Sequence, residues 1–401
     1  MKTTVGVFFG GRSVEHEISV LTALQAMYAF DSNKYNIVPV YISKEGRWYS
    51  GEALMSVSNF RDMNALKAQC EEVYMNPEFG DYNLYRRKKK LFGSPIVTTL
   101  DVVVPALHGT NGEDGVFQGL LETIGIPFAG CNTLSAAIGM DKIVMKMVLE
   151  SCNIPIVDYV WFTDKQWFAD RDRWADEVEQ KIGYPVIVKP ANLGSSVGIS
   201  RADNRAELMT KVDEASRYST RLVVEDLVEN LKEINCSVLG DCDDYMASVC
   251  EEPIKSGKIL SYEDKYMGGS QGESGMQASE KRIPADLTPE QTARVQFLAG
   301  ETFRVLSCHG VARVDVMIDD NTGDIYVNEI NAIPGSLSFY LWEATKVPFD
   351  ELMDRMVQLA LKRKREAANK TVSYTQNIFA LGGGGVKGVK GAKGAKGAKL
   401  K

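Results

Sequence analysis

Two neighbouring stretches decide how the carboxyl-terminal part of this chain folds: Arg-Val-Asp-Val-Met-Ile (313–318) and Asn-Glu-Ile-Asn-Ala-Ile-Pro-Gly (328–335). Apolar and polar residues alternate in both, which predicts two strands whose polar side chains share one face. The segment Asp-Asp-Asn-Thr-Gly (319–323) lies between them and favours a hairpin turn. The polar side chains expected to meet on that face are Arg313, Asp315, Glu329 and Asn331.

Oxygen-bearing side chains on such a hairpin suit a hard metal ion. Asp315, Glu329 and Asn331 offer carboxylate and amide oxygens. Mg²⁺ uses a few such ligands and completes its shell with phosphate and water. The same alternation would also arise on the solvated face of an ordinary antiparallel pair. The motif alone leaves a nucleotide–metal site and a plain solvated strand pair both open.

The composition indicates a globular protein with sizeable cores. The 401 residues are 44% hydrophobic and 25% charged, which is ordinary for a chain of two or three domains. No secretion signal is recognisable and no stretch approaches the roughly 20 apolar residues of a membrane span, so a cytoplasmic location is predicted. The seven scattered cysteines form no Cys-x-x-Cys pair, which argues against a zinc site and against a disulfide framework.

The charge is distributed unevenly along the chain. The net charge is −7, but the last sixteen residues carry six lysines and no acid, which leaves −13 for residues 1–385. The Gly- and Lys-rich segment 382–401 has too few apolar side chains to offset the entropy of ordering, so a flexible tail is predicted over 371–401. Two interpretations remain open for it: contact with anionic surfaces, or a dispensable extension.

Strand and helix patterns alternate in the first part of the chain. Residues 3–9 are an apolar run that ends at a glycine pair, and residues 18–30 then show helical spacing. Further strand candidates lie at 36–42 and 101–106, each followed by a loop and a helix. This order predicts a parallel sheet covered on both faces, with ligands at the carboxyl ends of its strands. The glycine pair lacks the spacing of a dinucleotide fingerprint, so a nicotinamide site is not favoured.

The region between these strand candidates has a less regular pattern. Residues 45–95 show no clear periodicity and include the five cations of 86–90, for which a solvated loop is favoured over a phosphate-backbone site. His108 precedes a glycine-bearing loop and a predicted helix over 115–124. It is a candidate either for phosphate or substrate contact or for a local hydrogen bond.

Lysines beside small residues indicate polyphosphate binding. Helical spacing runs from 133 to 151, with Thr133 as the expected cap and Lys142 and Lys146 on the polar face. Lys189 ends a short apolar strand just before Asn-Leu-Gly-Ser-Ser-Val-Gly (192–198). The ammonium would supply positive charge, and the small residues would let backbone amides approach phosphate oxygens.

The motifs occur in an order that resembles the D-alanine:D-alanine ligases over roughly residues 3–365. The motifs that carry the resemblance are His108-Gly, Met140-Asp141-Lys142, Val-Ile-Val-Lys189-Pro, Gly194-Ser195-Ser196-Val-Gly198, Tyr262-Glu-Asp-Lys265-Tyr266, Arg313-Val-Asp315 and Asn328-Glu329-Ile-Asn331 with Pro334-Gly335. The resemblance implies an α/β (α+β) protein with the three-domain ATP-grasp architecture. Its parts would be a parallel α/β substrate domain at 1–130, a central subdomain at 131–221, a catalytic domain at 222–370 and the tail at 371–401.

The resemblance also implies how ATP and metal are held. Glu225 would lie where the family binds adenine, and Glu233 where it binds ribose, although the intervening residues 226–232 are less typical of the family. Two Mg²⁺ ions, or Mn²⁺, would be bound by Asp315, Glu329 and Asn331. The implied contacts to the nucleotide phosphates come from Lys142, Lys189, Ser195, Ser196 and Lys265.

The chemistry implied is peptide-bond formation between two D-alanines, as in the synthesis of peptidoglycan precursor. Glu15 would receive the ammonium of the first amino acid and would link to Ser195 and Tyr266 across the closed site. Arg313 and the amide of Gly335 would stabilise the tetrahedral intermediate. A homodimer is also implied.

One position departs from the family pattern. After Pro334-Gly335 the usual ligase reaches a Ser-Leu pair that holds the carboxylate of the second amino acid, whereas here Tyr340 precedes Leu341. A phenol donates a hydrogen bond, but its bulk reshapes the pocket. The acceptor therefore stays open between D-alanine, D-serine or another small amine and, less favoured, D-lactate.

Overall fold

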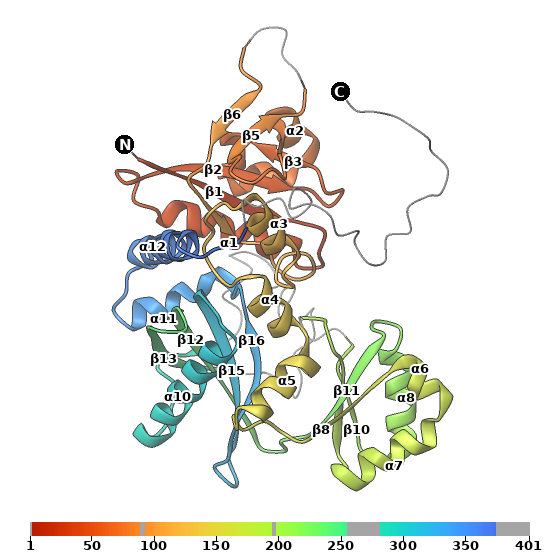
Figure 1. The fold of residues 1–401 in the computed structure, drawn as a ribbon. Helices are drawn as coiled ribbons and strands as arrows, with labels where there is room; N and C mark the ends of the chain where they lie inside the picture. Colours follow the sequence, from red (N-terminus) through yellow and green to blue (C-terminus); the bar gives the residue numbers. More distant parts are fainter. Residues whose placement is uncertain (1, 89–92, 195–197, 255–280, 374–401) are drawn as a thin grey trace, which may run out of the picture. The chain divides into compact units, whose positions relative to one another are not determined.

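The computed structural model describes residues 2–88, 93–194, 198–254 and 281–373. The chain divides into two units, residues 1–364 and residues 365–401. Three sheets lie within the first unit (Figure 1). In the described part of the chain, no helix combines the length and the apolar character needed to cross a membrane.

The first sheet has seven strands in the order β6-β5-β4-β3-β2-β1-β7. Only β2-β1-β7 is parallel, and each of the other neighbours pairs antiparallel. The three predicted strands, β1, β2 and β7, therefore pair parallel as expected, and the remaining four strands, which the sequence did not reveal, extend the sheet antiparallel from β2. The five residues between β2 and β3 are too few for the crossover that a parallel pair needs, so they form a hairpin. The strands are β1 (Thr3–Gly10), β2 (Tyr35–Ile42), β3 (Trp48–Ser50), β4 (Glu71–Met75), β5 (Asn83–Arg86), β6 (Ile96–Thr99) and β7 (Val102–Pro105).

The segment 45–95, which looked irregular in sequence, supplies most of that outer edge. It contains β3, β4 and β5, and between β3 and β4 it forms short helices: η1 (Glu52–Met55), η2 (Val57–Arg61) and α2 (Met63–Ala68). Strands of three to five residues leave little room for a recognisable alternation, which explains why the pattern was missed.

Helix α1 (His16–Ala29) packs on β1 and carries the sequence away from its carboxyl end. The turn between them needs Gly10, which has φ +91° and where a Cβ would meet the carbonyl oxygen of Ile42 at 2.3 Å. Val7 and Phe9 of β1 and Ala23 of α1 are fully buried in one core. This packing fixes Glu15, directly before α1, at the carboxyl edge of the parallel strands. Helix α3 (Val116–Ile124) follows β7 as predicted.

The predicted helix over 133–151 is two helices, α4 (Thr133–Met140) and α5 (Lys142–Ser151). Asp141 between them is extended, with φ −95° and ψ 101°, and its side chain accepts hydrogen bonds from Ile143 N and Val144 N as the cap of α5. The cap of α4 is Asn132, not Thr133. Aspartate competes with the helical backbone for its own hydrogen bonds, which favours a cap over a helix interior.

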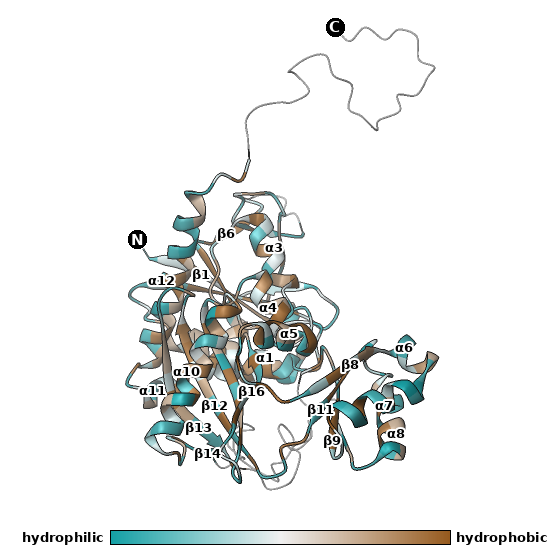
Figure 2. Cartoon of the chain, turned by 60° about the horizontal axis from the view of Figure 1, so that its bottom comes forward, coloured by the Kyte–Doolittle hydropathy of each residue, from teal (hydrophilic) through white to brown (hydrophobic). Residues whose placement is uncertain are grey.

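The second sheet is antiparallel, in the order β10-β9-β11-β8. Its strands are coloured mainly hydrophobic in Figure 2, whereas the covering helix α7 is mainly hydrophilic. Phe162 and Trp167 stack in its core with ring centroids 5.2 Å apart. Its elements are β8 (Tyr159–Thr163), α6 (Asp164–Ala169), α7 (Arg171–Lys181), β9 (Val186–Pro190), β10 (Ser200–Ala202), α8 (Arg205–Ala215) and β11 (Arg221–Asp226).

The third sheet has the order β14-β13-β12-β15-β16, all antiparallel, and α10 lies against it (Figure 1). The predicted hairpin is β15–β16. After β16 the chain forms a short 3-10 turn and two helices. The elements are β12 (Leu231–Gly240), β13 (Tyr245–Pro253), β14 (Lys281–Arg282), α10 (Pro289–Val305), β15 (Gly310–Asp319), β16 (Ile325–Asn331), η3 (Gly335–Ser338), α11 (Phe339–Ala344) and α12 (Phe349–Ala368).

Candidate functional site

The β15–β16 hairpin brings its four polar side chains together, as predicted. Arg313 lies opposite Asn331, and Asp315 lies opposite Glu329. The Arg313 guanidinium donates two hydrogen bonds to the Asp315 carboxylate, at 2.6 and 2.7 Å, and Asn331 Nδ2 donates a third at 3.0 Å. These contacts hold Asp315 in one orientation on the face of the sheet.

This polar row continues across two more strands. Asn235 of β12 lies opposite both Asp315 of β15 and Glu251 of β13. Directly opposed residues share a face of a sheet, so Glu251, Asn235, Asp315 and Glu329 form one line of polar side chains. Glu251 is 1% exposed, and the sequence analysis did not single it out. The sequence around Glu251, with Cys250 before it and Glu252 after it, does not set this residue apart as functional. Only the cross-strand register identifies it.

The Asp315 surroundings fit a bound cation. Burial raises the pKa of Asp315, Arg313 opposes this, and the charges of Glu329 and Glu233 raise it further. Two additional carboxylates close enough to disfavour ionisation of a third mark a place where a divalent cation is favoured. Asp315 and Glu329, with the side-chain amide of Asn331, provide the oxygen donors that Mg²⁺ prefers.

Three lysines converge next to this row. Lys142 Nζ lies 3.3 Å from Glu329 Oε2 and donates to the Leu193 carbonyl at 3.0 Å. Lys189 Nζ lies 2.6 Å from Glu225 Oε2, and Lys146 Nζ lies 3.4 Å from Glu225 Oε1. All three lysines are buried. Such a concentration of enclosed positive charge suits an anionic polyphosphate.

Lys146 was not among the predicted site residues, although a signal for it existed. It lies four residues after Lys142 on α5, so the two side chains project from one helix face. Lys146 is fully buried, and burial lowers its pKa while Glu225 opposes that shift. Burial would raise the pKa of Glu225, but Lys146 and Lys189 outweigh it and hold that pKa at about 2. Asn328, whose side-chain oxygen lies 3.3 Å from Lys189 Nζ, is a second unforeseen member.

Glu15 lies between two glycines that come from different parts of the chain. A Cβ at Gly109 would lie 2.6 Å from Glu15 Oε2, and one at Gly194 would lie 3.5 Å from the same oxygen. Gly109 has φ +70°, so a side chain there would be disfavoured on both grounds. The structure thus places Glu15 beside the start of the predicted phosphate loop. Ser195, Ser196, Lys265 and Tyr266 lie outside the described residues.

Gly335 begins a tightly wound turn in which Ser336, Leu337 and Ser338 all have positive φ, between 52° and 54°. Two side chains from earlier in the chain hold the backbone around this turn. Glu113 Oε1 accepts a hydrogen bond from Ile333 N at 3.1 Å, and Thr22 Oγ1 accepts one from Ser336 N at 3.1 Å. Left-handed backbone in non-glycine residues persists where the surroundings enforce it, as at active sites.

His108 and Glu113 belong to this support. His108 Nε2 lies 2.8 Å from Thr22 Oγ1, which favours the local hydrogen-bonding role for His108, and burial lowers its pKa to about 4. Glu113 also accepts from Gly109 N at 2.8 Å. Burial, and then the charge of Glu15, raises the pKa of Glu113 to about 8. Its role was not foreseen, because Ile333 and Glu15, unlike Gly109, lie far away in sequence.

Tyr340, the residue that departs from the family pattern, faces the polar row. Its hydroxyl donates to Glu251 Oε2 at 3.0 Å, and Lys281 Nζ lies 4.1 Å from the centre of its ring. Burial, and then Glu251, raises the pKa of Tyr340, so the phenol stays protonated near neutral pH. The phenol thus projects to β13.

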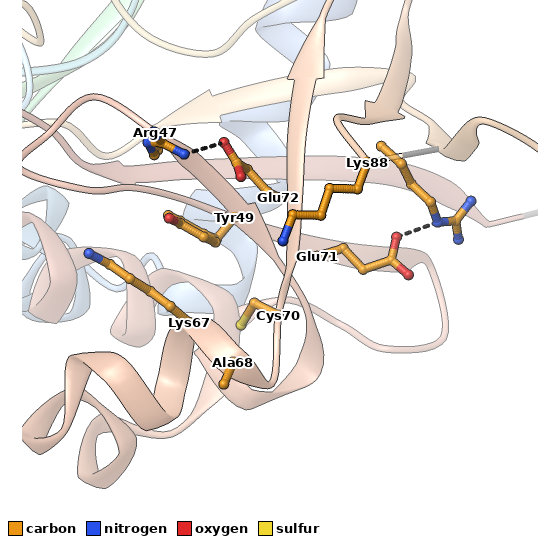
Figure 3. A pocket seen from close by; sticks show the side chains of 9 residues that line it. Arg47, Tyr49, Lys67, Ala68, Cys70, Glu71, Glu72 and Lys88 are labelled. Atoms are coloured by element: carbon orange, nitrogen blue, oxygen red, sulfur yellow. Dashed lines mark hydrogen bonds and ion pairs between the residues drawn. The ribbon is translucent and has the colours of Figure 1, made fainter. Parts of the chain in front are cut away.

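A cavity of about 510 Å³ lies elsewhere, at the outer edge of the first sheet (Figure 3). Three of its four cations have acidic partners: Arg47 lies 3.3 Å from Glu72, Lys67 lies 3.1 Å from Glu45, and Arg86 pairs with Glu71. Arg86 belongs to the cation run 86–90, whose residues 89 and 90 lie outside the described part. This cavity contains none of the predicted site residues.

Known proteins match the chain along nearly its whole length. The family model for the D-ala D-ala ligase N-terminus matches residues 4–131, and that for the C-terminus matches residues 148–358. The D-alanine–D-alanine ligase of Thermosipho melanesiensis is 36% identical over 377 residues, covering 94% of this chain and 98% of that protein. That of Heliobacterium modesticaldum is 39% identical over 370 residues, covering 91% and 96%.

Solved structures agree with these matches. The D-alanine-D-alanine ligase from Coxiella burnetii superposes with a TM-score of 0.73 at 30% identity, covering 92% of this chain and 96% of that one. The VanG D-Ala:D-Ser ligase from Enterococcus faecalis gives 0.76 at 27% identity, covering 90% and 100%. With its three sheets, the chain is an enzyme of the ATP-grasp fold. It belongs to the D-alanine–D-alanine ligase family, whose members use ATP and a divalent metal.

Proposed function

We propose that this protein joins two D-alanines into D-alanyl-D-alanine, with conversion of ATP to ADP and phosphate, for the synthesis of peptidoglycan precursor. The observation that carries this proposal is a continuous series of contacts. Glu15 lies beside Gly194, Lys142 contacts both Leu193 and Glu329, and Glu329 lies opposite Asp315. The relatives named D-alanine–D-alanine ligase support the choice of substrate.

ATP would be held by its phosphates and by its nucleoside. Lys142 and Lys189 are proposed to bind the phosphates together with Ser195, Ser196 and Lys265, and Lys146 is added because it faces the same carboxylate as Lys189. Glu225 and Glu233 are proposed for adenine and ribose. Asp315, Glu329 and Asn331 would hold two Mg²⁺ ions, or Mn²⁺. Bound there, the metal would neutralise charge on the β- and γ-phosphate oxygens.

Ligation would proceed in two steps. The carboxylate of the first D-alanine attacks the γ-phosphorus of ATP, which forms an acyl phosphate and releases ADP. The amine of the second D-alanine attacks the acyl carbon, loses a proton, and expels inorganic phosphate as the peptide bond forms. Glu15 would anchor the ammonium of the first D-alanine during both steps, because an enclosed ammonium needs an acidic partner.

Charge that develops in the second step would be stabilised by fixed donors. Arg313 is held in place by its two hydrogen bonds to Asp315, and the Gly335 amide lies at the start of the strained turn. Donors fixed before the reaction stabilise an oxyanion without the cost of reorganising. Ser195 and Tyr266 are proposed to complete the enclosure with Glu15, which would keep water from the acyl phosphate.

Tyr340 favours a second candidate, the same chemistry with another acceptor. Its hydroxyl is engaged with Glu251, so it does not simply replace a serine hydroxyl. D-Serine is the leading alternative, since the similar structure from Enterococcus faecalis is that of a D-Ala:D-Ser ligase. Another small amine and D-lactate are the further alternatives.

The test is product analysis of the purified chain with ATP and Mg²⁺. D-alanine alone should yield ADP and D-alanyl-D-alanine, identified by mass, and Arg313→Met should lower kcat by on the order of 100-fold or more. D-serine and D-lactate are then added in competition with D-alanine. A predominant mixed product would replace the D-alanine acceptor by the alternative, and absence of any ligated product would contradict the proposed function.

Assembly, location and domain limits follow from the resemblance and the composition. We propose a homodimer, a cytoplasmic location, and domains that divide near residues 130, 221 and 370. The basic tail, of which residues 374–401 lie outside the described part, is proposed as an accessory contact for anionic surfaces. Sedimentation analysis tests the dimer. Removal of residues 382–401 should preserve ligation while it weakens binding to anionic vesicles.

A further inference from the structure

We propose that Lys281 binds the carboxylate of the second amino acid, and that Glu251 and Tyr340 position its ammonium for that purpose. The inference rests on the proposed function and deepens it, because it assigns a specificity-determining residue to the acceptor side of the site. Lys281 takes part in none of the motifs that suggested the activity.

The sheet register places Lys281 beside the acidic end of the polar row. Lys281 of β14 lies opposite Pro253 of β13, two residues from Glu251, so Lys281 and Glu251 are diagonal neighbours on one face. Lys281 Nζ lies 3.2 Å from Glu251 Oε1 and 4.1 Å from the centre of the Tyr340 ring. Its side chain remains 33% exposed, whereas that of Glu251 is 1% exposed. The ammonium therefore covers a buried carboxylate and keeps access to an incoming molecule.

Glu251 has a full set of donors. It accepts from Tyr340 Oη at 3.0 Å and from Asn235 Nδ2 at 3.3 Å, and it pairs with Lys281. A lysine ammonium has three N–H donors, so Lys281 retains donors for a second carboxylate after its contact with Glu251. Tyr340 supports the ammonium with its ring face, which attracts a cation. Lys281 therefore presents a positive charge for an anion, and Glu251 and Tyr340 hold that charge in position.

Tyr340 and Glu251 lie near Arg313, the proposed reacting centre. Asp315, and then Tyr340 and Glu251, surround the Arg313 guanidinium closely enough to act on its charge. The acceptor amine must reach the carbonyl whose oxygen Arg313 would stabilise. In an α-amino acid the carboxylate carbon lies only about 2.5 Å from the amine nitrogen, as follows from the backbone bond lengths. The carboxylate of the acceptor would therefore lie close to Tyr340 and Glu251. Glu251 alone would repel this carboxylate, and Lys281 would attract it.

D-Alaninamide separates acceptor binding from the other steps. It lacks a carboxylate that could be phosphorylated, so it serves only as the second substrate. Wild-type enzyme supplied with ATP, Mg²⁺, D-alanine and D-alaninamide should form mainly D-alanyl-D-alanine. In Lys281→Met the ratio of D-alanyl-D-alanine to D-alanyl-D-alaninamide should fall by about 10- to 100-fold, the loss expected for a hydrogen bond between charged groups. The KM for the first D-alanine should change little.

Two further variants distinguish binding of the acceptor by Lys281 from a purely structural pairing of Lys281 with Glu251. Arg282→Gln is the matched control, because Arg282 lies on the same strand but pairs with Glu252 at 3.1 Å; its product ratio should equal that of the wild type. Glu251→Gln/Lys281→Met removes the buried charge that Lys281→Met would leave unpaired. If Lys281 binds the acceptor, the double variant keeps the lowered ratio.

The opposite outcomes are clear. A wild-type ratio in the double variant, or an equal loss of both products in Lys281→Met, would overturn the role of Lys281 as acceptor ligand and leave it as a partner of Glu251. If wild-type enzyme forms neither product, the proposed function itself has failed. Thermal unfolding of each variant confirms that product ratios are compared between folded proteins.

Discussion

Glu113 shows how one side chain gains its role by joining a nearby residue to a distant part of the chain. It accepts hydrogen bonds from Gly109 N and Ile333 N, and burial together with Glu15 raises its pKa to about 8. Near neutral pH the folded protein therefore retains a proton that the unfolded chain releases at the ordinary glutamate pKa of about 4.3. Because the folded state binds more protons in this interval, the contribution to stability falls as pH rises.

That difference predicts a pH dependence. The contribution of Glu113 should be fully present below its unfolded pKa and be lost as pH rises to about 8. Glu113→Gln should be less stable than wild type at pH 5 by roughly 1–3 kcal/mol, since one backbone donor loses its acceptor. The gap should narrow towards pH 8 in urea unfolding. Glu177→Gln, an exposed change on α7, is the control, and a gap that widens with pH would contradict the assignment.

Lys146 gives a second prediction for a single residue. Lys146→Met removes a fully buried cation but leaves Glu225 paired with Lys189 at 2.6 Å. The KM for ATP should increase by about tenfold or more, the size expected for one charged contact, and the KM for D-alanine should change less. Lys211→Met, at an exposed pair with Glu214, is the matched control. Equal effects on both substrates would show that Lys146 acts through the fold.

Among the elements, the break between α4 and α5 positions Lys142. Asp141 caps α5 through Ile143 N at 3.1 Å and Val144 N at 3.0 Å, and it pairs with Arg221 of β11. Asp141→Ala should lower the free energy of unfolding by about 0.5–2 kcal/mol, as for other lost caps, and should raise the KM for ATP. Asp141→Asn retains an oxygen for the cap and should lose less. If urea unfolding shows equal losses of stability in Asp141→Ala and Asp141→Asn, the loss comes from the ion pair with Arg221 and not from the helix cap.

These elements also show what the sequence could reveal. The β15–β16 hairpin was predicted with the side chains that share one face, because strict alternation separates the two faces of a strand. The break at Asp141 was missed, since apolar spacing continues through 133–151 despite it. Glu113 and Glu251 could not be recognised, because tertiary contacts and strand register bring them to the site, whereas Lys146 was placed on the same helix face as Lys142 but was given no role. Motif resemblance singled out Glu15 and Arg313, and the roles given to them stay predictions.

For the whole molecule, the proposed site predicts stabilisation by ligand. In the proposed site ATP with Mg²⁺ would bind residues from several elements of the first unit, so it should favour the folded state. At 100 times its Kd, a ligand adds about 2.7 kcal/mol. The Tm should therefore rise with ATP and Mg²⁺, and excess EDTA should remove most of the rise. Lys189→Met should show a smaller increase, and an unchanged Tm in wild-type enzyme at saturating ATP would contradict the site.

The turn at 335–338 has a consequence for exchanging parts between related ligases. Its backbone is held by Thr22 and Glu113, which lie more than two hundred residues earlier in the chain. A chimera that joins the amino-terminal portion of one relative to the carboxyl-terminal portion of another would combine the turn of one parent with the residues of the other parent at positions 22 and 113. Thr22, Glu113 and the turn must therefore be transferred together, and a chimera junction anywhere between Glu113 and Ile333 separates Glu113 from the turn.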